Sequence, residues 1–104
     1  MSYMKEEVSF RPTELVARIG DGTVTGDAAR VAAFYIKTAF EDAPLLLSED
    51  GFFDVKHYTI DEIIETAKEI MAAPEAAAIL EEEINRQKAS GEGMHTVILT
   101  DGDI

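Results

Sequence analysis

The stretch TIDEIIETAKEIMAAPEAAAILEEEINRQK, residues 59–88, decides the fold because it predicts two consecutive helices. Thr59 and Glu62 have the spacing of a capping box, in which each side chain bonds the backbone N–H of the other. Proline ends a helix and is favoured at the first position of the next one, so we expect a break at Pro74. The first helix has one apolar face with helical periodicity, formed by Ile60, Ile63, Ile64, Ala67, Ile70 and Met71.

Before this stretch, the sequence predicts a strand, two helices and a short hairpin. The strand covers residues 3–10, and Pro12 begins a helix that Gly20 would end in a left-handed conformation. A second helix is expected over residues 28–40, because apolar residues cover most of its circumference. Residues 45–55 indicate two short strands around a four-residue turn, with a helix through the leucines as an equal alternative.

After this stretch, residues 94–100 predict a final strand, because Val97, Ile98 and Leu99 are β-forming residues. Three consecutive apolar residues indicate that both faces of this strand are covered. The chain, residues 1–104, is therefore expected to be a single small α+β domain, rich in helix, with about four helices and a short sheet of two to four strands.

The composition excludes several classes of protein. The 104 residues contain 21 Asp and Glu against 9 Lys and Arg, which gives a net charge of −12, and they contain no cysteine. This charge opposes direct contact with nucleic acid or anionic lipid. No run of about 18 apolar residues could span a membrane, and the first 20 residues lack the apolar segment of a signal peptide. We therefore expect a cytoplasmic protein that contacts neither a membrane nor nucleic acid directly.

No motif for a metal ion, a cofactor or a nucleophile is present. The acidic turn 21–27 places oxygen donors at alternate positions, but Ala32 occupies the twelfth position, where a calcium loop needs glutamate. The glycines of this turn do not have dinucleotide-binding spacing, and no lysine follows them. We therefore expect no metal and no cofactor. His57 or His95 could act as a general acid or base, which leaves a small enzyme as one alternative.

The acidic residues are concentrated in the second half of the chain. Residues 53–104 hold 12 acids and 4 bases, against 9 and 5 in residues 1–52. Asp61, Glu65 and Glu69 recur every four residues, about 6 Å apart along one helix face, close to the spacing of phosphates in a nucleic-acid strand. Like charges at this spacing destabilise a helix. Our candidate partner-binding residues are Asp61, Glu62, Glu65, Glu69, Glu75, Glu81, Glu82 and Glu83.

This acidic face has two interpretations. It could only keep the protein soluble, or it could bind a basic protein, in the extreme as a nucleic-acid mimic. The chain resembles phage anti-defence and nuclease immunity proteins in size and charge alone. We expect a non-enzymatic protein-interaction module that inhibits or regulates a basic partner. The alternative is a homo-oligomeric structural or assembly subunit, such as a homodimer, because the helix 28–40 and Phe52–Phe53 offer much apolar surface.

Overall fold

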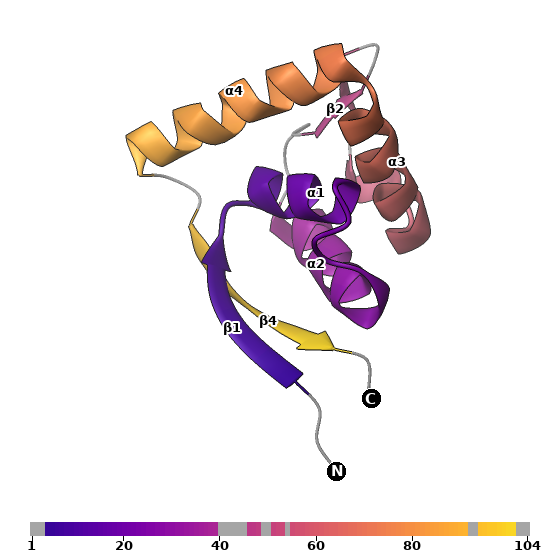
Figure 1. The fold of residues 1–104 in the computed structure, drawn as a ribbon, viewed down its shortest axis with the longest axis vertical. Coiled ribbons are helices and arrows are strands. Elements are labelled where there is room, and N and C mark those ends of the chain that lie inside the picture. Colours follow the sequence, from indigo (N-terminus) through magenta and orange to yellow (C-terminus); the bar gives the residue numbers. More distant parts are fainter. Residues whose placement is uncertain (1–3, 40–45, 49–50, 54, 92–93, 102–104) are drawn as a thin grey trace.

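Four helices and two small antiparallel sheets form the fold, which confirms the expected α+β class (Figure 1). The computed structural model describes residues 4–39, 46–48, 51–53, 55–91 and 94–101. The elements in chain order are β1 (Met4–Phe10), α1 (Pro12–Gly20), α2 (Gly26–Ala39), β2 (Leu46–Ser48), β3 (Gly51–Phe53), a 3-10 turn η1 (Val55–His57), α3 (Ile60–Ala72), α4 (Pro74–Ser90) and β4 (His95–Asp101).

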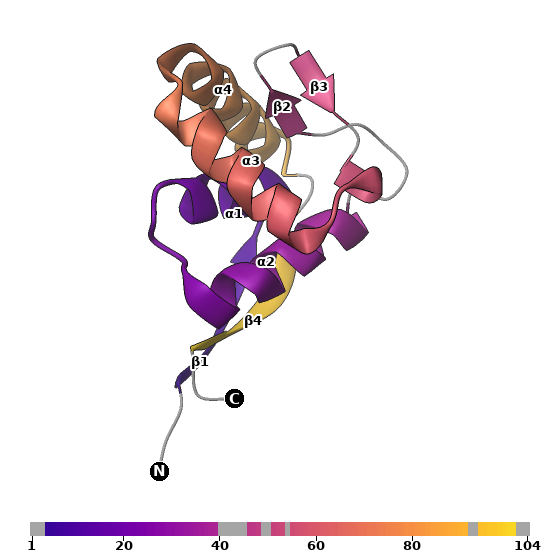
Figure 2. The ribbon, with the colours of Figure 1, turned by 90° about the vertical axis from the view of Figure 1, so that its right-hand side faces the viewer.

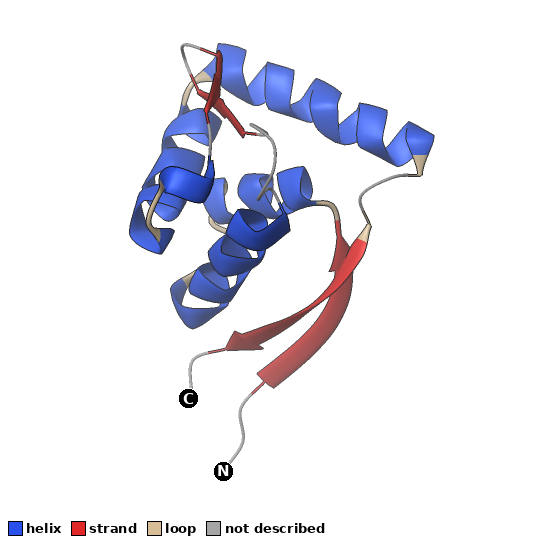
Figure 3. Ribbon diagram, turned by 180° about the vertical axis from the view of Figure 1, so that it is seen from behind, coloured by secondary structure: helices blue, strands red, loops and turns tan. Residues whose placement is uncertain are grey.

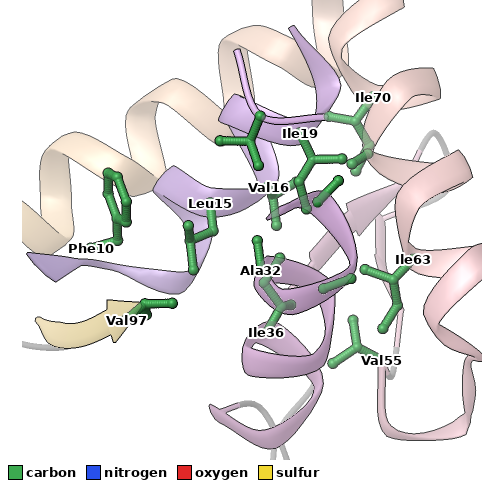
Figure 4. Close-up of a cluster of buried hydrophobic side chains, with 14 of the residues drawn as sticks. Phe10, Leu15, Val16, Ile19, Ala32, Ile36, Val55, Ile63, Ile70 and Val97 are labelled. Carbon is green, nitrogen blue, oxygen red and sulfur yellow. The ribbon is translucent and has the colours of Figure 1, made fainter. Parts of the chain in front are cut away.

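The hydrophobic core lies where α1, α2 and α3 meet (Figure 4). Each helix contributes one apolar face at the helical spacing that the sequence shows. On α2 this face is narrower than expected, because Phe34 is 64% exposed. The residues that are at most 2% exposed include Leu15, Val16 and Ile19 of α1, Ala32, Ala33 and Ile36 of α2, Val55 of η1, and Ile63, Ala67 and Ile70 of α3.

Helix α3 begins with the capping box that the sequence predicts. Thr59 Oγ1 accepts a hydrogen bond from the Glu62 backbone N–H at 3.1 Å, and Glu62 Oε1 accepts one from the Thr59 N–H at 2.8 Å. These two bonds satisfy backbone donors that would otherwise have no partner at the helix start. Pro74 then begins α4, as expected, and α4 ends at Gly91, whose φ of 74° is left-handed.

Gly20 ends α1, but the predicted reason is wrong. Its φ is not among the positive values, which occur at Gly22, Gly26 and Gly91. A Cβ atom at Gly20 would lie 2.2 Å from Met71 Cγ and 2.3 Å from the Ala67 carbonyl oxygen. Glycine is therefore needed because α1 and α3 approach each other too closely for a side chain.

Strands β1 and β4 form an antiparallel two-stranded sheet in which Val8 pairs with Val97 (Figure 3). Val97 and Leu99 are buried, whereas Ile98 between them is 51% exposed. The prediction that both faces of this strand are covered is wrong, because successive side chains point to opposite faces. Helix α2 packs against β4, and among the described residues only β1 pairs with this strand.

The hairpin alternative for residues 45–55 is confirmed for residues 46–48 and 51–53, whereas Val55, which was expected in the second strand, lies in the 3-10 turn η1. Leu46 pairs with Phe53 and Ser48 with Gly51, so β2 and β3 are antiparallel (Figure 2). The helical alternative through the leucines is thereby excluded for residues 46–48. The predicted four-residue turn covers residues 48–51: Ser48 and Gly51 pair as strand residues, and residues 49–50 lie outside the described residues.

Polar groups contribute to the contact between α4 and α1. Thr13 Oγ1, which is buried, donates a hydrogen bond to Gln87 Oε1 at 3.1 Å. Lys88 Nζ lies 3.8 Å from Glu14 Oε2. Only Ala76 and Leu80 of the 17 residues of α4 are buried, so most of this helix faces solvent.

Candidate acidic interaction surface

The acids of α3 lie on the face opposite to the core. Asp61, Glu65 and Glu69 are exposed, while the buried residues of the helix are Ile63, Ala67 and Ile70. With 3.6 residues per turn, these two sets occupy opposite sides of the helix. The predicted line of carboxylates is therefore present on an outward surface.

Three of the four α3 acids already have partners within the protein. Asp61 Oδ1 accepts a hydrogen bond from Arg30 Nη1 of α2 at 2.5 Å, and Glu65 Oε2 lies 4.0 Å from Lys68 Nζ. Glu62 belongs to the capping box. Among the described residues, Glu69 has no hydrogen bond or ion pair, so the predicted line is not uniformly available to a partner.

On α4, Glu83 differs from the other three acids. It is half-buried, whereas Glu75, Glu81 and Glu82 are exposed. Its carboxylate accepts hydrogen bonds from Arg86 Nε at 3.2 Å and Gln87 Nε2 at 3.0 Å, and Arg86 Nη2 makes a further bond. The Arg86 bond lowers the pKa of Glu83, burial opposes this effect, and the Gln87 bond adds to it. The Glu83 carboxylate is therefore engaged in hydrogen bonds within α4.

Four of the eight candidate acids remain available, and we call them the unpaired acids: Glu69, Glu75, Glu81 and Glu82. Within the described part of the chain, none of these carboxylates has an ion pair or a hydrogen bond, and all four are exposed. Glu69 lies near the end of α3 and Glu75 near the start of α4, where the two helices meet in Figure 1, and Glu81 and Glu82 lie near the middle of α4. Sequence spacing alone could not separate them from the paired acids, because Arg30 belongs to a distant helix.

Ile79 is a residue of this surface that the sequence reasoning missed. It lies on α4 and is 50% exposed. Helical spacing in the sequence does not signal this exposure, because Ala76, which lies three residues before Ile79 and so on the same side of the helix, is buried. An apolar side chain thus lies within the acidic surface.

The two histidines lie on separate elements, and both are exposed. His57 ends η1, and His95 begins β4, where its ring lies 5.4 Å from the ring of Tyr35 in an edge arrangement. The Tyr35 hydroxyl is buried without a hydrogen-bond partner among the described residues, and burial raises the pKa of Tyr35. An ordinary phenol is mostly protonated at neutral pH, and a raised pKa makes it less available as a base.

An open cleft of about 430 Å³ lies beside the glycine-rich turn that follows α1. Its lining is mostly apolar and includes Ile19, Val24, Ala29 and Ile64, with Asp21 and Lys68 as the charged members. In the part of the chain that the structure describes, no three His, Asp or Glu side chains could hold a metal ion together.

No family model matches this chain, and neither the curated proteins nor the solved structures contain a significant match. None of the described helices combines the length and apolar character that crossing a membrane requires.

Proposed function

We propose that this chain is a non-enzymatic interaction module that binds a basic, nucleic-acid-binding protein and inhibits or regulates it. The observation that carries the proposal is the group of four unpaired acids, Glu69, Glu75, Glu81 and Glu82, exposed where α3 meets α4. With a net charge of −12, the whole molecule would attract a basic partner from a distance and accelerate association.

The distribution of the basic residues supports this proposal over a purely solubilising role. Lys68 lies near Glu65, Arg86 binds Glu83, and Lys88 lies near Glu14. The cations of α3 and α4 thus lie beside acids outside the group of unpaired acids. The carboxylates of the unpaired acids are left without a neighbouring positive charge among the described residues.

The proposal is tested with a labelled 14-residue oligolysine peptide as the basic probe. Replacing Glu75→Gln and Glu82→Gln together should weaken peptide binding about tenfold, which corresponds to about 1.4 kcal/mol. The melting temperature should stay unchanged, because both side chains are exposed. Binding of the wild-type protein should also weaken steeply between low and high salt.

The matched control is Asp61→Asn with Glu65→Gln, which removes the same charge from acids that already have partners. This control should weaken peptide binding by less than about threefold. Equal losses in both double variants would show that total charge alone acts, and would contradict a docking surface at the unpaired acids.

A further inference from the structure

Ile79 lies between two unpaired acids on the outward face of α4. Glu75 precedes it by four residues and Glu82 follows it by three, which places all three side chains on one side of the helix. Ala76 and Leu80 form the buried side of this helix. Glu75 and Glu82 are exposed and Ile79 is 50% exposed, so this face reaches solvent, with an apolar side chain at its centre and a carboxylate on each side.

Isolated apolar side chains on a surface are ordinary, so the neighbours of Ile79 matter. The other large apolar side chains that are exposed among the described residues are Phe34 of α2, Met94 before β4, and Ile98 of β4. None of these three belongs to α3 or α4, which carry the unpaired acids. Ile79 combines half exposure with an unpaired carboxylate one turn before it and another one turn after it, the arrangement of an apolar anchor inside a charged rim.

We propose that the face Glu75–Ile79–Glu82 binds an amphipathic basic segment of a protein, which places an apolar side chain on Ile79 and lysine or arginine beside each glutamate. This inference rests on the proposed function and names the chemistry of its partner. The partner must carry an apolar side chain as well as positive charge, because a purely cationic surface would leave Ile79 without an apolar contact.

Charge complementarity selects this occupant over the others. An uncharged apolar surface would remove the carboxylates of Glu75 and Glu82 from water without a counter-charge, which is strongly unfavourable. A second copy of this chain would bring a further net charge of −12 to the same face. A nucleic acid or an anionic membrane would repel it in the same way.

Two synthetic 14-residue peptides test the inference. One alternates leucine and lysine at helical spacing, and the other carries the same lysines with serine in place of every leucine. The wild-type protein should bind the leucine–lysine peptide about tenfold more tightly at 150 mM salt. Ile79→Gln, which keeps a good helix former on an exposed site, should reduce this preference to less than about twofold and leave binding of the serine–lysine peptide unchanged.

The matched control is Ile98→Gln, because Ile98 is 51% exposed and Ile79 is 50% exposed. This variant should keep the full preference for the leucine–lysine peptide. Equal binding of both peptides by the wild-type protein, or loss of the preference in Ile98→Gln, would overturn the inference. So would a dimer, seen by sedimentation, that Ile79→Gln dissociates.

The outcomes also separate this inference from the proposed function. If both peptides bind equally and the Glu75→Gln, Glu82→Gln protein loses both, the acidic surface binds cations and the role of Ile79 is wrong. If neither peptide binds the wild-type protein, the proposed function is wrong and the inference falls with it.

Discussion

Helix α1 contacts α3 and α4 in opposite ways. Against α3 it packs without room for a side chain at Gly20, where a Cβ atom would lie 2.3 Å from the Ala67 carbonyl oxygen. Against α4 it relies on polar contacts, among them the bond from Thr13 to Gln87. Close apolar packing fixes a helix firmly, whereas hydrogen bonds orient a helix but contribute little net stability. Of the two acidic helices, α3 is therefore held firmly in the core, and α4 is the helix that exposes most of its surface.

Gly20→Ala should have the largest effect, because it breaks the contact between α1 and α3. The added methyl group meets backbone as well as the Met71 side chain, so the free energy of unfolding should fall by about 3 kcal/mol. Urea denaturation measures this loss. The double variant Gly20→Ala, Met71→Ala should recover little, because the Ala67 carbonyl oxygen still blocks the site. Full recovery would show that the contact is only between side chains.

Thr13→Val should have a smaller effect, because it removes a polar contact between α1 and α4 while keeping the shape of the side chain. Gln87 Oε1 then loses a buried donor, and the free energy of unfolding should fall by about 1 kcal/mol. A double-mutant cycle with Gln87→Ala isolates the pair. Additive losses in that cycle would mean that the hydrogen bond contributes nothing to the contact.

Much of this architecture could be predicted from the sequence, because it depends on local rules. The capping box of Thr59 and Glu62, the proline at the start of α4 and the periodic apolar residues of α3 each act over a few residues. The hairpin of β2 and β3 was one of two open alternatives, because short apolar runs fit both strand and helix.

The failures concern contacts between elements distant in the chain. The need for glycine at position 20 comes from Ala67 and Met71 of another helix, and the single covered face of β4 depends on where α2 packs. In the candidate site, the partner of Asp61 is Arg30, 31 residues away, so spacing could not show which acids are paired. Helical spacing could not show that Ile79 is exposed, because Ala76, three residues before it, is buried.

Glu83→Gln should have the smallest effect, and its size should depend on pH. The Arg86 hydrogen bond holds the pKa of Glu83 below its ordinary value of 4.5 in the folded protein. The carboxylate therefore adds stability above about pH 4.5, and this contribution is lost as the pH falls through the lowered pKa. At pH 7 the variant should be a few tenths of a kcal/mol less stable, because Arg86 is mostly exposed.

Thermal unfolding of both proteins between pH 3 and pH 7 measures this difference. The two melting curves should converge toward pH 3, where the wild-type carboxyl group becomes protonated. If the difference in melting temperature stays constant over the whole range, the charge of Glu83 does not contribute to its hydrogen bonds with Arg86 and Gln87.

The pairing of β1 with β4 has a consequence for the order of folding. Met4 lies opposite Asp101, so this sheet closes a loop that contains nearly the whole chain (Figure 1). Bringing the ends of so long a loop together costs roughly 4 kcal/mol in lost chain entropy. The contacts among α1, α2 and α3 close shorter loops, so their entropic cost is lower. Because a two-stranded sheet contributes little stability by itself, we expect the helices to assemble before β1 and β4 pair on α2.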